Sequence, residues 1–130
     1  MRRPEDNPPI RPAHLIGSSL EDLREMPAQV RRAFGYAIGR AQRGEKARAA
    51  GPLRGFHGAG VLEVVDDCDG DTYRAVYTVR FAEIVYVLHV FQKKSRRGTR
   101  TPAQEMEIVR ARLRRAEYHY RSEFRPTRSD

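Results

Sequence analysis

The first half of the chain contains a clear helical pattern of hydrophobic and polar positions. After Pro27, apolar residues recur three or four positions apart, which predicts a helix with one buried face. Pro27 suits the first turn of this helix, and Gly44 suits its end. The apolar positions are Val30, Phe34, Ala37, Ile38 and Ala41. The opposite face is basic, with Arg31, Arg32 and Arg40.

A shorter helix is expected just before this one, ending at about Met26. Ser18 with Glu21, or Ser19 with Asp22, has the spacing of a capping box, in which side chains satisfy the free N–H groups of the first turn.

The middle of the chain has the period of a sheet. Strands are predicted over residues 61–65, 72–80 and 84–91, and a short first strand over residues 14–16. The acidic run 66–71 ends in an Asp-Gly turn signal, and residues 82–83 form a second turn. Segment 84–91 is almost continuously apolar, which is typical of a buried central strand. The last three strands should form an antiparallel meander.

A final helix is predicted from Thr101-Pro102, with apolar residues again three and four positions apart. These are Met106, Val109, Leu113, Ala116 and Tyr120. Together the patterns predict an α+β fold, in which N-terminal helices pack on an antiparallel sheet of three or four strands and a C-terminal helix follows.

The length of 130 residues suits one compact domain, which we place at residues 14–124. Residues 1–13 are polar and rich in proline, so a disordered tail is expected there, and residues 125–130 should form a flexible tail. Cys68 is the only cysteine, which excludes a disulfide framework within the chain and favours the cytoplasm. No apolar segment approaches the roughly 18 residues of a membrane span.

The formal net charge is +8, which favours a polyanionic partner such as RNA, DNA or an anionic surface. The alternative is that the charge serves only solubility. The sequence has no HExxH, P-loop, GxSxG or zinc-finger spacing, so the usual signatures of many enzyme classes are missing. We expect neither a metal ion nor a cofactor.

The strongest candidate for chemistry is the segment 92–100, directly after the buried strand, in which five of nine residues are basic. Such a cluster can bind phosphate and stabilise charge during phosphodiester cleavage, or it can be a solvated loop. Arg74 lies in mid-strand and points away from the Tyr73 face. Its side chain therefore lies at a sheet rim or in a cleft.

Two histidines are candidates for proton transfer near neutral pH. His89 lies within the apolar strand, where a histidine is more often part of the core. His57 lies in a glycine-rich segment before a strand. The acidic run 66–71 lacks the later glutamate of an EF-hand loop, so calcium binding is not expected.

Two motifs identify a family resemblance. The sequences YRAVY at residues 73–77 and LHVFQKKS at residues 88–95 resemble the phage-derived HigB-like toxins of the RelE superfamily. The resemblance extends over roughly residues 14–120. It implies a compact RelE-like fold and metal-independent cleavage of mRNA on the ribosome. In that reaction the 2′-hydroxyl attacks the adjacent phosphate and leaves a cyclic phosphate and a 5′-hydroxyl.

The resemblance also implies roles for individual residues. Arg74 is expected to hold the scissile phosphate, and Lys93 and Lys94 to bind RNA and stabilise the developing charge. The general base and acid stay open among His89, His57, Tyr73 and Lys94. Further RNA contacts are expected from Arg54, His57, Arg96, Arg97 and Arg100.

The implied partners are mRNA, the ribosome and a HigA-like antitoxin with a helix-turn-helix domain, which would silence the toxin in a hetero-oligomer. No membrane partner is expected. Two other hypotheses are a non-catalytic nucleic-acid-binding module and a phage structural or assembly protein.

Overall fold

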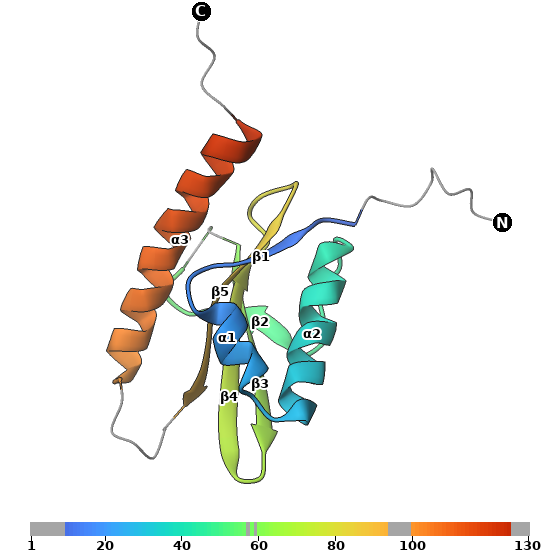
Figure 1. Cartoon of the computed structure of the whole chain (residues 1–130), viewed down its shortest axis with the longest axis vertical. Coiled ribbons are helices and arrows are strands. Elements are labelled where there is room, and N and C mark those ends of the chain that lie inside the picture. Colours follow the sequence, from blue (N-terminus) through green and yellow to red (C-terminus); the bar gives the residue numbers. More distant parts are fainter. Residues whose placement is uncertain (1–9, 57, 59, 94–99, 126–130) are drawn as a thin grey trace, which may run out of the picture.

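The computed structural model describes residues 10–56, 58, 60–93 and 100–125, and it forms a five-stranded sheet with helices on both faces (Figure 1). The strand order is β1-β5-β4-β3-β2. The strands are β1 (Ala13–Leu15), β2 (Ala50–Pro52), β3 (Val61–Cys68), β4 (Asp71–Thr78) and β5 (Val85–Lys93). The helices are α1 (Ser19–Arg24), α2 (Ala28–Gln42) and α3 (Pro102–Phe124).

The predicted α+β class is confirmed, but the sheet differs from the prediction in two ways. It has five strands rather than three or four, and β1 pairs with β5 in parallel. The extra strand, β2, covers only three residues of a segment that the sequence pattern assigns to a connection. A three-residue strand has too few positions to show an alternating pattern.

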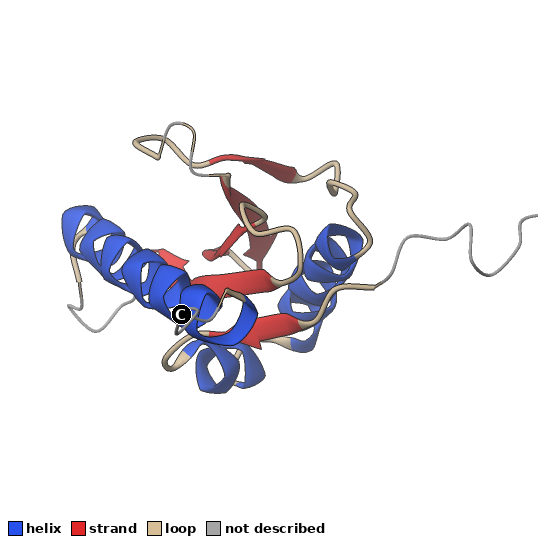
Figure 2. Cartoon of the chain, turned by 90° about the horizontal axis from the view of Figure 1, so that it is seen from above, coloured by secondary structure: helices blue, strands red, loops and turns tan. Residues whose placement is uncertain are grey.

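The two long helices cover opposite faces of the sheet, as the view from above shows (Figure 2). On one face, Val30 and Phe34 of α2 pack against Ala75 and Tyr77 of β4. On the other face, Val109 of α3 belongs to a second cluster that contains strand side chains of the opposite orientation. The sheet is therefore the middle of three layers, and successive strand residues face different helices.

The β3–β4 hairpin is tighter than predicted. Both strands extend into the acidic run 66–71 and leave a turn of only Asp69 and Gly70. The φ angles of these two residues are 50° and 82°, as a two-residue type I′ turn requires. The acidic side chains on either side therefore belong to paired strands.

A bulge interrupts the pairing of β4 with β5. Val76 lies opposite His89 and Tyr77 opposite Val87, so Leu88 is the extra residue. Leu88 belongs to the α3-side core, and His89 hydrogen-bonds to residues of α3. The bulge thus places two successive side chains on the same face of the sheet.

The helix starts follow different rules. α3 begins with a complete capping box, in which Thr101 and Gln104 bond to each other's backbone N–H groups. The capping box predicted for α1 is wrong, because Ser18 makes no side-chain cap and instead donates its hydroxyl to Asp22 at 2.7 Å. No helix among the described residues has the length and apolar character needed to cross a membrane.

Candidate nucleic-acid interface

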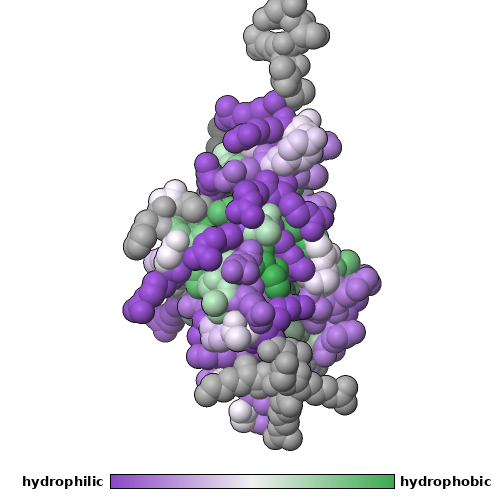
Figure 3. All heavy atoms as spheres, turned by 90° about the vertical axis from the view of Figure 1, so that its left-hand side faces the viewer, coloured by the Kyte–Doolittle hydropathy of each residue, from purple (hydrophilic) through white to green (hydrophobic). Residues whose placement is uncertain are grey.

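The α3 side of the sheet contains a cleft of about 800 Å³ between β2 and the first turns of α3. We call it the sheet cleft. Seen from the α3 side, the molecule is largely hydrophilic around a smaller apolar area (Figure 3). The cleft is lined by Pro52, Leu53, Arg54, Glu63, Arg74, Phe91, Gln92, Lys93, Arg100, Pro102, Glu105 and Met106.

Strand register brings the cationic floor of the sheet cleft together. Arg74 lies opposite Phe91, and Lys93 is two residues further along β5, so all three side chains share one face. Tyr73 and Ala75 belong to the core on the α2 side, which fixes the orientation of Arg74 between them. The sequence prediction that Arg74 points away from Tyr73 is therefore confirmed.

Arg74 is only partly committed to other protein groups. Its Nη1 lies 3.2 Å from Oε2 of Glu63, and the two side chains are 25% and 24% exposed. Its Nε is buried and has no hydrogen-bond partner within the described part of the chain. A guanidinium has five N–H donors, so the exposed part of Arg74 can bind an anionic oxygen while Nη1 stays on its carboxylate partner.

Two further arginines come from separate segments. Arg54 follows β2, and Arg100 stands just before α3. Arg100 donates to Oε1 of Glu105 at 3.1 Å. The structure thus brings four of the predicted site residues to one cleft: Arg54, Arg74, Lys93 and Arg100.

His89 lies beneath the sheet cleft. It is 1% exposed, and its ring stacks against Phe91 with 4.6 Å between centroids. Nδ1 lies 3.2 Å from Nη1 of Arg112, and Nε2 lies 3.0 Å from Oε2 of Glu105. A guanidinium can only donate, so Nδ1 accepts and the proton sits on Nε2, which donates to Glu105.

This environment keeps His89 neutral. Burial lowers its pKa to about 4, and the positive charges of Arg112 and Arg100 add to the effect, against a smaller opposing effect of Asp22. A buried imidazole with both nitrogens hydrogen-bonded has no free position for a substrate proton. The arrangement favours a structural role for His89.

Arg112 connects three elements under the sheet cleft. It donates to the carbonyl of Leu88 at 3.1 Å and to the Ser18 hydroxyl at 3.0 Å, in addition to Nδ1 of His89. Leu88 lies beyond the part of β5 that pairs with β1, which ends at Val87. The side chain therefore satisfies a strand carbonyl that β1 does not reach.

The remaining predicted residues fall into two groups. Tyr73 is buried on the α2 side, where burial and neighbouring acidic groups raise its pKa, so it lies on the opposite face from Arg74. The other predicted positions lie outside the described residues. They are His57, Lys94, Arg96 and Arg97.

Sequence reasoning missed the acidic residues of the sheet cleft. Strand alternation could have pointed to Glu63, because its side chain faces the opposite side of the sheet from Leu62 and Val64, which belong to the α2-side core. Glu105 and Arg112 are seven positions apart, a spacing that places both on one helix face. Nothing in the local pattern reveals that this helix face packs on His89 of β5.

The chain matches the model of a known protein family. The model of the family described as "Phage derived protein Gp49-like (DUF891)" matches residues 21–114. That range contains all residues that line the sheet cleft. No curated protein matches the chain significantly.

Proposed function

The chain belongs to the Gp49-like family of phage-derived proteins, and on this basis we propose that it is the toxin of a toxin–antitoxin system and cleaves RNA as a metal-independent endoribonuclease. One observation carries the proposal. Arg54, Arg74, Lys93 and Arg100, from four separate segments, line one cleft. Convergent cations in a partly desolvated cleft stabilise the charge of a phosphoryl transition state.

The proposed reaction uses the 2′-hydroxyl of the substrate as the nucleophile. The carboxylate of Glu63 accepts its proton, and the 2′-oxygen bonds to phosphorus while the bond to the 5′-oxygen breaks. Arg74, held beside Glu63 at 3.2 Å, binds the non-bridging oxygens through the exposed part of its guanidinium. The ammonium of Lys93 supplies a proton to the leaving 5′-oxygen, so the products are a cyclic phosphate and a 5′-hydroxyl.

The walls of the sheet cleft support single-stranded RNA as the substrate. Phe91 and Met106 offer aromatic and apolar surface between the cations. Unpaired bases stack on such surface, whereas the bases of a duplex are not available for stacking. We propose mRNA on the ribosome as the biological substrate, in line with the resemblance of YRAVY and LHVFQKKS to HigB-like toxins.

A HigA-like antitoxin with a helix-turn-helix domain is the proposed partner. A protein that covers the sheet cleft would have to meet Arg54 and Arg100 at its rim, so acidic residues are expected on its contact surface.

The experiment compares the purified wild-type chain with Arg74→Lys and Lys93→Ala on two substrates. Primer extension maps cuts in an mRNA on translating ribosomes, and a free RNA is incubated with a chelator. Both variants should lose about 100-fold or more of the cleavage rate. Arg121→Ala, an exposed arginine on the last turns of α3, is the control and should cleave normally.

Two outcomes would contradict the proposal. Full cleavage by both variants would remove the sheet cleft as the site. Binding of RNA by the wild type without any cut would support the non-catalytic RNA-binding module instead.

A further inference from the structure

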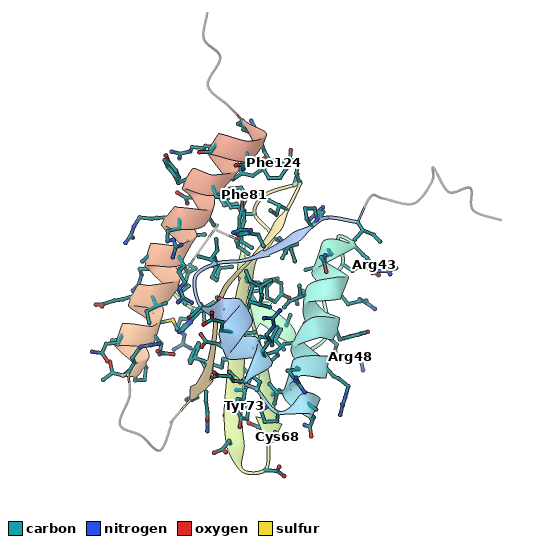
Figure 4. The ribbon with its side chains drawn as sticks, in the orientation of Figure 1. Arg43, Arg48, Cys68, Tyr73, Phe81 and Phe124 are labelled. Carbon is teal, nitrogen blue, oxygen red and sulfur yellow. The ribbon has the colours of Figure 1, made fainter. Side chains whose placement is uncertain are left out.

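A second basic surface lies on the opposite side of the sheet from the sheet cleft. α2 and α3 lie on either side of the sheet (Figure 1). α2 packs its apolar residues on the sheet and directs its polar residues outward, whereas the cleft is lined by residues at the start of α3. Arg43 and Arg48 lie on this outer side (Figure 4). We call the surface the α2 basic face; it consists of Arg31, Arg32, Tyr36, Arg40, Arg43, Lys46 and Arg48.

The charge of the α2 basic face is almost unopposed. Residues 28–49 contain six basic side chains and one acidic side chain, Glu45. Arg40 pairs with Glu45 at 3.7 Å, and the other five cations form no ion pair with any described residue. On α3, by contrast, five arginines are nearly balanced by four glutamates. Like charges gathered without partners raise the free energy of the protein until an anion binds.

One side chain of this face is held in place for binding. Nη1 of Arg40 donates to the hydroxyl of Tyr36 at 3.2 Å, and the guanidinium lies 5.8 Å from the centre of the Tyr36 ring. Tyr36 itself is 61% exposed. The pair therefore presents an oriented guanidinium and an aromatic edge to the solvent.

The exposed surface between the cations has two glycines in mid-helix. A Cβ atom at Gly35 or Gly39 would meet no atom within 4 Å, so core packing does not require either glycine. Each destabilises the helix by about 1 kcal/mol relative to alanine. Because glycine has no side chain, the helix surface between the arginines is shallow at these two positions. A bulky anionic backbone can therefore approach the helix closely there.

The composition of the face distinguishes among anionic partners. A membrane-bound helix inserts apolar side chains into the lipid, but those of α2, including Val30 and Phe34, are buried in the core. A single-stranded RNA needs several stacking side chains, and Tyr36 is the only aromatic residue of the face. Arginine outnumbers lysine five to one, which favours paired hydrogen bonds to phosphate.

We propose that the α2 basic face binds the phosphate backbone of double-helical RNA. The chain would then hold two kinds of RNA at once, a folded RNA on α2 and a single strand in the sheet cleft. The inference goes beyond the proposed cleavage reaction and does not depend on it, because no residue of the α2 basic face lines the sheet cleft.

The test measures binding of the full-length chain to two 2′-O-methyl RNAs, which lack the nucleophile and stay intact. One is a duplex of about 20 base pairs and the other a single strand of the same length without self-complementarity. The α2 variant combines Arg31→Glu, Arg32→Glu and Arg43→Glu. The control combines Arg114→Glu, Arg115→Glu and Arg121→Glu on the exposed surface of α3 and has the same net charge.

The α2 variant should bind the duplex at least about tenfold more weakly at about 0.1 M salt, with a salt slope reduced by about two to three, and should bind the single strand normally. The control should bind both RNAs nearly normally. The double variant Arg74→Ala with Lys93→Ala should weaken binding of the single strand only. An error in the proposed role of the sheet cleft and an error in that of the α2 basic face would therefore give different results.

Equal losses in the α2 variant and the control would overturn the proposal, because net charge alone would then explain the binding. It would also be overturned if the α2 substitutions left duplex binding intact but abolished binding to poly-glutamate or to phosphatidylserine vesicles. If the triple variant melts early in circular dichroism, Arg32→Gln with Arg43→Gln replaces it, with an expected loss of about threefold or more in duplex affinity.

Discussion

The guanidinium of Arg112 lies 3.2 Å from Nδ1 of His89, so the buried imidazole accepts there and carries its proton on Nε2. Its folded pKa of about 4 is below the ordinary value of 6.5. Between these values the unfolded chain binds more protons at this residue than the folded chain. Stability should therefore fall as the pH drops from about 6.5 to about 4, by up to about 3 kcal/mol.

Urea denaturation of the wild type and of His89→Gln at several pH values checks this prediction. Glutamine can accept from Arg112 and donate to Glu105 but does not titrate. The variant should lose most of the acid sensitivity in this window. His14, whose pKa is also lowered by burial, is present in both proteins and cancels in the difference. An equal decline in both would mean that His89 does not drive it.

Replacing Arg112 by alanine should destabilise the fold by about 2–4 kcal/mol. The carbonyl of Leu88 and Nδ1 of His89 would lose their donor in a largely buried place. Thermal and urea unfolding measure the loss, with the exposed Arg114→Ala as the control, for which less than about 0.5 kcal/mol is expected. Comparable losses in the two variants would contradict the assigned role.

Two glycine-to-alanine substitutions should have opposite signs. Gly17 has a φ of +61°, and a Cβ there would lie 3.0 Å from the guanidinium carbon of Arg112, so Gly17→Ala should destabilise by about 1–2 kcal/mol. Gly35 is in mid-helix with open space around it, so Gly35→Ala should stabilise by up to about 1 kcal/mol. Melting temperatures of both variants decide the signs.

Glu63→Gln tests the proposed base. It should lower the cleavage rate about 100-fold or more and leave the affinity for an uncleavable single strand within about threefold. Loss of affinity in parallel with rate would instead indicate that Glu63 only positions Arg74. Asp67→Asn on the β3–β4 hairpin removes a carboxylate from the same strand outside the cleft and serves as the control.

Local pattern predicted the elements whose periodicity extends over many positions. The stripe from Val30 to Ala41 and the alternation around Arg74 both correspond to observed faces of α2 and β4. Local pattern could not predict β2 or the parallel pairing of β1. Each of these strands has three residues and forms only by pairing with a distant segment. Pattern also cannot locate the bulge at Leu88, which alters the face of His89 relative to strict alternation.

The candidate site divides in the same way. A basic cluster after a buried strand and a mid-strand arginine are visible in sequence, and they direct attention to Lys93 and Arg74. The importance of Glu63 and Glu105 becomes visible only in tertiary contacts, since Glu63 pairs with Arg74 of β4 and Glu105 hydrogen-bonds to His89 of β5. These side chains come together through strand register and helix packing, which cannot be read from a short segment of sequence.

The spacing of Glu105 and Arg112 has a consequence for how the sheet cleft can vary. The two residues are seven positions apart and both hydrogen-bond to His89, which fixes the rotation of α3 about its own axis. A one-residue insertion between them would turn one relative to the other by about 100°. Either Arg112 would leave the carbonyl of Leu88 and Nδ1 of His89, or Glu105 would leave Nε2 of His89. The position of Glu105 in the cleft wall therefore depends on the position of Arg112 against β5. Substitutions can change other side chains of α3, but an insertion or deletion in these two turns would break one of the two contacts.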